Sequence, residues 1–174
     1  MALNFKDTVV DAAASDMPAE LTGVLDYWRN ACDGRFAPAW NKFHLDEVDP
    51  AVVPRCTVVD VIDGGRDFVY RFWGTARVKL HQFDMTGKSI FDFRPEELAE
   101  SAAHQFNAVL ASRRASWFTV VASGDAEDTF TFWFLRLPIS DDGETVNKIV
   151  SFNFNRHSRL ELEALQRQRL SRRA

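Results

Sequence analysis

Several kinds of residue and motif are scarce in this chain of 174 residues, and each shortage argues against a class of structure. Its two cysteines, Cys32 and Cys56, form no CxxC pair, which indicates reduced core thiols in a cytoplasmic protein. No apolar run reaches the length of a membrane span. Lys6 and Asp7 interrupt the stretch where a signal peptide needs an apolar core. We therefore expect neither export nor membrane insertion.

A nucleotide-binding loop is also missing, although residues 87–89 read Gly-Lys-Ser, the end of a phosphate-binding P-loop. That loop needs a second glycine five residues earlier, where this chain has Gln82. Pro95 then blocks an uninterrupted helix after the motif. We interpret the segment as a turn in which Gly87 has a positive φ and Asp84 or Thr86 caps a neighbouring turn.

Metal sites and nucleic-acid binding have little support. The four histidines, His44, His81, His104 and His157, lack metal-ligand spacing, so no metal is expected. The net charge of -4 argues against a nucleic-acid-binding body. Residues 156–174 do carry six arginines against two glutamates, in a predicted polar helix with a few leucines. This helix could form a short dimer seam or a solvated basic end.

Secondary-structure patterns alternate along the chain without repeats. Helical spacing of apolar residues predicts a helix within 15–34, short helical turns over 75–83 and a longer helix over 95–115. Runs rich in β-branched and aromatic residues predict five strands over 55–63, 67–74, 116–123, 128–139 and 145–156. We expect an α+β fold: a five-stranded antiparallel sheet, helices between strands two and three, and flanking helices at both ends.

The fourth predicted strand is apolar on both faces. Phe130, Phe132 and Phe134 alternate with Trp133, Leu135 and Leu137. The helices between strands two and three can cover one face of the sheet. The other face needs the N-terminal helix, which carries Trp28, or a second subunit.

One long stretch resembles a known family. The segment "YRFWGTARVKLHQFDMTGKSIFDFRP" is similar to a bacterial family of small, single-domain PAS sensor proteins, through Tyr70, Arg71, Gly74, Thr75, Asp84, Thr86 and Gly87. The resemblance extends over residues 20–155. It implies an N-terminal cap over 1–54, a PAS domain over 55–155 and a basic helix over 156–174.

The PAS resemblance implies a mostly apolar ligand pocket between the sheet and the long helix. Its expected apolar lining is Tyr70, Phe72, Phe106, Val109, Phe130, Phe132 and Phe152, and its expected polar residues are Arg71, Thr75, His81 and His104. The alternative interpretation is that these aromatic residues simply fill a core.

Cofactor chemistries known in PAS proteins can be compared with these residues. Light-oxygen-voltage photochemistry uses a cysteine after the second strand, and residues 75–114 contain none, so we expect flavin–cysteine chemistry to be excluded. Cys56, on a predicted strand, is badly placed for a thioester chromophore. His104 could ligate a haem iron, but a lone helical histidine is more often solvated.

The function that the resemblance implies is a non-catalytic, cytoplasmic PAS sensor or interaction module. We expect a homodimer that binds a small apolar or aromatic ligand and signals to a separate effector protein, without membrane or nucleic acid. One alternative is a cone-shaped α+β enzyme of the isomerase or dehydratase type, which needs an inward His–Asp pair. Another is a purely structural dimer.

Overall fold

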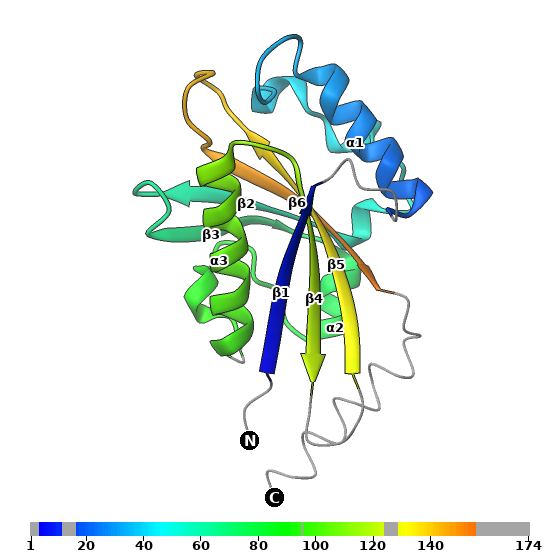
Figure 1. The fold of residues 1–174 in the computed structure, drawn as a ribbon, viewed down its shortest axis with the longest axis vertical. Coiled ribbons are helices and arrows are strands. Elements are labelled where there is room, and N and C mark those ends of the chain that lie inside the picture. Colours follow the sequence, from blue (N-terminus) through cyan, green and yellow to red (C-terminus); the bar gives the residue numbers. More distant parts are fainter. Residues whose placement is uncertain (1–3, 12–16, 95, 124–128, 156–174) are drawn as a thin grey trace, which may run out of the picture.

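The structure is a computed structural model that describes residues 4–11, 17–94, 96–123 and 129–155. Its centre is a six-stranded antiparallel sheet in the order β1-β4-β5-β6-β2-β3 (Figure 1). The strands are β1 (Asn4–Asp11), β2 (Cys56–Ile62), β3 (Asp67–Trp73), β4 (Ser116–Ser123), β5 (Thr129–Ile139) and β6 (Lys148–Asn155).

The helices form two groups along the sequence, one before β2 and one between β3 and β4. Helix α1 (Ala19–Ala31) and three single-turn 3-10 helices, η1 (Trp40–Lys42), η2 (Leu45–Glu47) and η3 (Val53–Arg55), precede β2. Helix α2 (Thr75–His81), the 3-10 helix η4 (Ile90–Asp92) and helix α3 (Glu96–Ser112) separate β3 from β4. From α1 onward this is the element order that the sequence analysis predicted for an α+β fold. The domain boundaries drawn at residues 54 and 155 stay a prediction.

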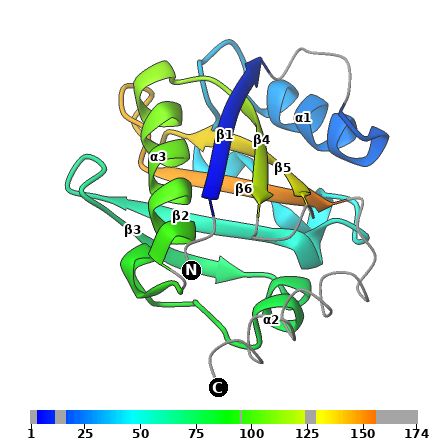
Figure 2. The same cartoon turned by 60° about the horizontal axis from the view of Figure 1, so that its bottom comes forward.

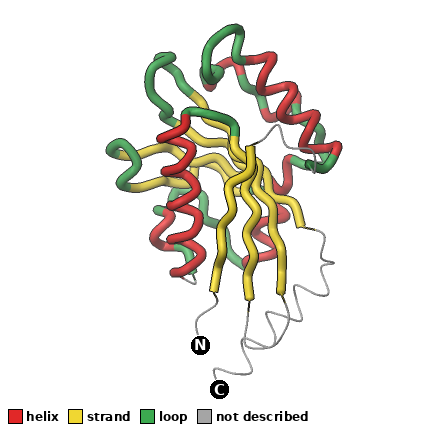
Figure 3. The backbone as a smooth tube through the Cα atoms, in the orientation of Figure 1, coloured by secondary structure: helices red, strands yellow, loops and turns green. Residues whose placement is uncertain are grey.

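All five predicted strands are confirmed, but the sheet contains a sixth strand that the sequence analysis assigned to the N-terminal cap. Strand β1 pairs with β4 from Asn4 opposite Ser123 to Asp11 opposite Ser116. Strands β1, β4 and β5 therefore run side by side at one side of the sheet (Figure 3). The helix predicted within residues 156–174 lies outside the described residues.

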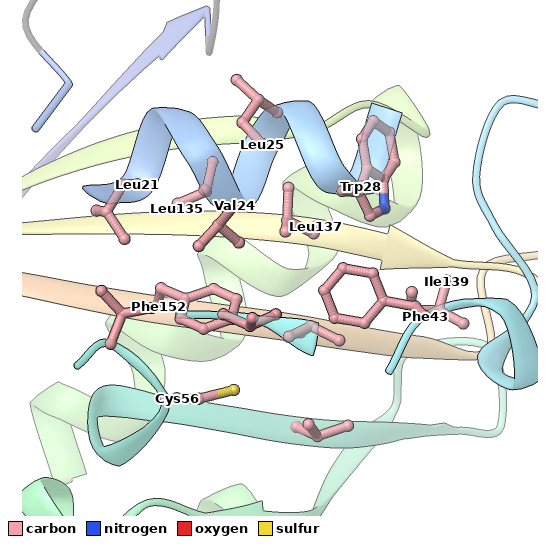
Figure 4. Packing of buried hydrophobic residues seen from close by; sticks show 14 of the residues in the cluster. Leu21, Val24, Leu25, Trp28, Phe43, Cys56, Leu135, Leu137, Ile139 and Phe152 are labelled. Carbon is pink, nitrogen blue, oxygen red and sulfur yellow. The ribbon is translucent and has the colours of Figure 1, made fainter. Parts of the chain in front are cut away.

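Helix α1 covers one face of the sheet, which we call the outer face. Its side chains Leu21, Val24, Leu25 and Trp28 pack in one cluster with Leu135, Leu137, Ile139, Phe152 and Cys56 (Figure 4). The indole Nε1 of Trp28 donates a buried hydrogen bond of 2.9 Å to the Pro138 carbonyl oxygen. The prediction that the N-terminal helix covers this face is confirmed.

The opposite face, which we call the inner face, is covered by α2, η4 and α3. Phe68 and Ile149 of the sheet pack there with Ile90, Phe106 and Val109. In Figure 2, α3 crosses this part of the sheet and α2 follows directly from the end of β3. The two faces therefore have separate apolar clusters, as the two-sided pattern of β5 requires.

The segment around Gly87 runs along the edge strand β3. The Gly87 N–H donates to the Tyr70 carbonyl oxygen at 2.7 Å, and the Tyr70 N–H donates to the Lys88 carbonyl oxygen at 3.0 Å. Gly87 has φ 79°, and the Asp84 carboxylate accepts hydrogen bonds from Thr86. The predicted turn is confirmed, and its backbone satisfies polar groups that an edge strand otherwise exposes.

Removing the indole of Trp28 tests the outer cover. We expect Trp28→Ala to lower the free energy of unfolding by about 3–5 kcal/mol, because it leaves a cavity between α1 and β5. Trp28→Phe should lose about 1 kcal/mol, since it mainly deletes the bond to Pro138. Chemical denaturation measures both. If Trp28→Ala unfolded at the wild-type midpoint, α1 would not be closing this face.

Two glycines test the β3 edge. Gly87→Ala should cost about 1 kcal/mol of unfolding free energy, because Gly87 has a positive φ but open space for a Cβ. Gly74→Ala should cost clearly more, because its Cβ would overlap the Pro54 carbonyl oxygen. Gly23→Ala, in the open on α1, is the control and should stabilise by about 0.5–1 kcal/mol. Equal thermal midpoints for all three variants would contradict the turn assignment.

Candidate ligand site on the inner face

A β-bulge in β3 decides which side chains reach the inner face. Tyr70 pairs with Val59 and Phe72 pairs with Val58, so Arg71 is an extra residue between two consecutive pairs. An extra residue reverses the alternation of side chains beyond it. Tyr70 and Trp73 therefore pack on the inner face, while Phe72 packs with the outer cluster.

Two of the predicted apolar lining residues lie on the outer face, which corrects the sequence-based pocket. Phe72 is moved there by the bulge. Phe152 lies there because it pairs with Leu135 of β5, whose neighbours on that face are Trp133 and Leu137. Neither side chain can line a pocket beneath α3.

Three of the predicted polar residues are exposed. Arg71 pairs with Asp60 at 2.9 Å on the surface, and Thr75 begins α2 as an exposed residue. His104 is exposed on α3, whose buried residues include Ala103 and Phe106 on either side of it in a helical turn. These three residues are wrong as members of a buried site.

Of the remaining predicted pocket residues, some are buried on the inner face and others are only half-buried or lie outside the described residues. Tyr70, Phe106 and Val109 are buried there, and His81 is half-buried among aromatic rings. Phe132 is half-buried on β5, and the side chain of Phe130 lies outside the described residues. Their contact with a ligand stays a prediction.

The inner face also carries a row of polar residues that crosses the sheet. Cross-strand pairing places Ser116 opposite Arg136, Arg136 opposite Ser151, Ser151 opposite Thr57, and Thr57 opposite Trp73. All five side chains are buried. Directly paired residues lie side by side on one face, so the row is continuous from β4 to β3. Burying such polar groups costs free energy unless they are hydrogen-bonded.

Arg136 is the centre of this row and is only 3% exposed. Its Nε and Nη2 donate to the Gln105 Oε1 of α3 at 2.9 and 2.7 Å, and its Nη1 donates to the Ser151 Oγ at 2.9 Å. Its guanidinium carbon also lies over the rings of Phe106 at 4.3 Å, Phe134 at 4.9 Å and Phe118 at 5.8 Å. These contacts compensate for the loss of hydration of a buried cation.

An aromatic cluster lies at the β3 end of the row. We define it by Tyr70, Trp73, His81, Phe83 and Phe93. The Trp73 ring lies 4.7 Å from the Tyr70 ring, 5.6 Å from the His81 ring and 5.8 Å from the Phe93 ring. His81 and Phe83 each also contact Phe93, at 5.0 and 5.7 Å. The cluster connects β3 to α2 and to the segment that follows it.

Two arginine side chains act electrostatically on the buried Tyr70 phenol. Burial raises the pKa of Tyr70, and the nearby charges of Arg136 and Arg77 oppose that rise. Arg77, on α2, has its guanidinium carbon 5.0 Å from the Trp73 ring centre. Burial lowers the pKa of Arg77 to about 10, so it remains charged at neutral pH. The site can therefore attract electron-rich groups.

Sequence reasoning missed much of this site, including Trp73, Arg77, Gln105 and Arg136. One signal was available, because Arg136 interrupts the otherwise apolar run "FWFLRLPI" and a cation in such a strand needs buried partners. Trp73 could not be placed, since its face depends on the bulge at Arg71.

The two cysteines are buried free thiols of the outer cluster. Burial raises the pKa of Cys32 to about 11 and raises that of Cys56 further. Both are protonated at neutral pH and are poor nucleophiles, as expected of core residues. In the described part of the chain, the helices are too short or too polar to span a bilayer.

Comparisons with known proteins give matches only among solved structures; no family model matches, and no curated protein is significantly similar. An RNA-binding light-oxygen-voltage receptor aligns with a TM-score of 0.49 at 16% identity over 98% of this chain and 44% of its own. This chain thus spans less than half of that protein's length. A fungal light-oxygen-voltage photoreceptor gives 0.43 at 13% identity, covering 79% of this chain and 94% of its own.

A third structure, from work on light-oxygen-voltage domain mechanism with a flavin analogue, gives a TM-score of 0.42 at 11% identity, covering 67% of this chain and 87% of its own. These matches contradict the cofactor prediction, which excluded flavin–cysteine photochemistry, because the aligned structures are light-oxygen-voltage proteins. Lack of a cysteine in residues 75–114 prevents a covalent sulfur bond there, but a flat ring can bind without one. Haem ligation by His104 is not retained either, since that side chain is exposed.

Replacing Gln105 tests the buried network. Gln105→Leu should lower the free energy of unfolding by about 2–3 kcal/mol, because two N–H groups of a buried cation lose their acceptor. In an Arg136→Met background the same change should cost much less, since no buried charge remains. Urea denaturation of the four proteins gives the coupling. Strictly additive losses would show that the two residues do not act together.

Proposed function

We propose that this chain is a non-catalytic PAS sensor or interaction domain that binds a small, partly aromatic molecule on its inner face and passes the effect to another protein. The observation that carries the proposal is the contrast between the two faces. The outer cluster is apolar and closed by α1, whereas the inner face has a buried polar row that ends in an aromatic cluster. Ligand sites combine an apolar lining with a few placed polar groups.

The elements around the aromatic cluster are short, which suits a site that responds to its occupant. Helix α2 has 7 residues and η4 has 3, so neither is held by a long row of backbone hydrogen bonds. Segments with few such bonds open at low free energy. A bound molecule that orders α2 against Trp73 would therefore change this part of the surface first.

A path from the site to the rest of the sheet passes through Arg136. This residue joins α3 to β5 and β6 through Gln105 and Ser151. Strand β6 ends at Asn155, next in sequence to the basic residues 156–174. We propose that this C-terminal segment or the outer face meets the effector. The expectation that nucleic acid is not a partner stays a prediction, because that segment lies outside the described residues.

Homodimer formation is part of the proposal and is supported by the outer face beyond α1. Phe72, Trp133 and Phe154 are half-buried at the margin of the outer cluster. Partly exposed aromatic rings of this kind are common in protein interfaces. The protein is proposed to be cytoplasmic, since its two buried thiols are unpaired.

The non-catalytic interpretation is supported by the chemistry of the inner face. Among the residues that the structure describes, the buried polar side chains are hydroxyls, amides and one guanidinium, with no carboxylate. An isomerase-type enzyme needs an inward acid–base pair. The order of elements, with strands before and after the helices that cover the inner face, is also that of a PAS domain.

Native mass spectrometry of freshly purified protein tests the proposal. We expect a dimer whose mass exceeds that of two denatured chains by a small molecule, and an absorption spectrum that identifies an aromatic or conjugated ligand. Trp73→Phe should reduce occupancy, whereas Phe72→Leu, on the outer face, should leave it unchanged. A bare chain that also fails to bind any member of a small-molecule library would contradict the sensor interpretation and favour a structural dimer.

A further inference from the structure

Three buried nitrogen donors on the inner face lack a hydrogen-bond partner in the described protein: Trp73 Nε1, Arg77 Nε and Asn153 Nδ2. Trp73 is 4% exposed and Asn153 is 7% exposed. A buried donor without an acceptor costs about 1–3 kcal/mol. Folded proteins rarely retain such groups unless something else supplies the acceptor. Three at one face therefore indicate a common occupant.

Two of the donors are neighbours, and the third lies two strands away on the same face of the sheet. Arg77 stacks over the Trp73 ring at 5.0 Å. Trp73 is opposite Thr57, which is opposite Ser151, and Asn153 follows two residues later on the same face of β6. Asn153 thus lies toward the end where β3 runs into α2. Two strand spacings separate β6 from β3, or about 10 Å, the length of a small bicyclic molecule.

The charge of the site selects the kind of acceptor. Arg77 is positive, and its charge and that of Arg136 both act on the Tyr70 phenol. The described buried side chains include no carboxylate that would supply negative charge from the protein. In a water-poor site a cation attracts an anion far more strongly than at the surface. A negatively charged acceptor therefore fits better than a neutral one.

The walls of the site select the body of the molecule. The ring centroid of Trp73 lies 4.7–5.8 Å from those of Tyr70, His81 and Phe93, and the His81 and Phe93 centroids lie 5.0 Å apart. Aromatic rings pack favourably against other aromatic rings in offset or edge-on contact. A planar, conjugated body is the kind of molecule that these rings would pack against.

We propose that the inner face binds an aromatic carboxylate whose carboxylate oxygens accept hydrogen bonds from Trp73 Nε1 and Arg77 Nε. The aromatic body lies against the cluster, and a second acceptor at its far end meets Asn153 Nδ2. This inference rests on the ligand site of the proposed function and specifies its occupant. Arg136 acts through Gln105 and Ser151 as a positioning residue and as a source of positive potential.

A matched series of probes tests the charge requirement. Isothermal titration of the full chain, unfolded and refolded to remove copurified molecules, would compare 2-naphthoate with 2-naphthamide and 2-ethylnaphthalene. We expect 2-naphthoate to bind at least tenfold more tightly than either neutral probe. 6-Hydroxy-2-naphthoate, which adds an oxygen for Asn153, should bind more tightly still, and Asn153→Leu should abolish that gain. Equal affinities for the acid and the amide would overturn the proposal.

Variants assign the contacts. Trp73→Phe and Arg77→Met should each weaken the affinity for 2-naphthoate at least tenfold and change the affinity for 2-naphthamide by no more than about threefold. The affinity of Arg77→Lys for 2-naphthoate should lie between those of the wild type and Arg77→Met. The control is Arg71→Met, which removes an exposed arginine whose Nε already pairs with Asp60. It should bind as the wild type does. Circular dichroism confirms that each variant is folded. Undiminished 2-naphthoate binding by folded Trp73→Phe and Arg77→Met would refute the assignment.

The outcomes separate this inference from the proposed function. If a neutral apolar molecule copurifies or binds best, and Trp73→Phe weakens it, the sensor function stands and the carboxylate assignment is wrong. If no probe binds and the donors hold only ordered water in a crystal structure, the carboxylate assignment is wrong as well. If, in addition, no molecule copurifies, the ligand-sensing function fails with it.

Discussion

The buried guanidinium of Arg136 is the interaction on which the inner half of the molecule depends. A cation at 3% exposure is tolerated only with good hydrogen bonds and polarisable neighbours. Gln105 and Ser151 supply the acceptors, and three phenylalanine rings supply the neighbours. These contacts come from α3, β4, β5 and β6, so the charge holds the four elements in one arrangement. In the proposed function, the same positive charge favours a negatively charged ligand nearby.

The sheet separates two environments with different physical roles. On the outer face, the apolar side of α1 and the Trp28 bond to Pro138 make a dry layer that stabilises the fold. On the inner face, the row from Ser116 to Trp73 brings polar groups beneath the helices that cover that face. An apolar layer is most stable when water and other molecules are excluded from it. A layer with unpaired buried donors is stabilised when a molecule with matching acceptors binds to it. The proposed function thus places recognition on the sheet face opposite the one that α1 closes.

Much of the fold was predictable from local pattern, and much of the site was not. Five strands, the α1 cover and the turn at Gly87 follow from periodicity, β-branched content and glycine chemistry, and all are observed. Strand β1 was missed because its pairing with β4 joins distant parts of the chain. Phe72 was misplaced and Trp73 overlooked for one reason, since strict alternation fails at the bulge. His104 is helical as expected, but on the exposed side.

The sequence by itself determined which segments become strands and helices, because hydrophobic period, turn residues and helix-end charges act over a few neighbouring residues. It also determined that both sheet faces need cover, since β5 is apolar on each side. Only the tertiary structure decided what the inner face presents. The extra residue at Arg71 places Trp73 on the inner face and Phe72 on the outer face. Cross-strand register then brings Arg136, Ser151 and Thr57 into one row. Register depends on the whole sheet, and the site depends on register.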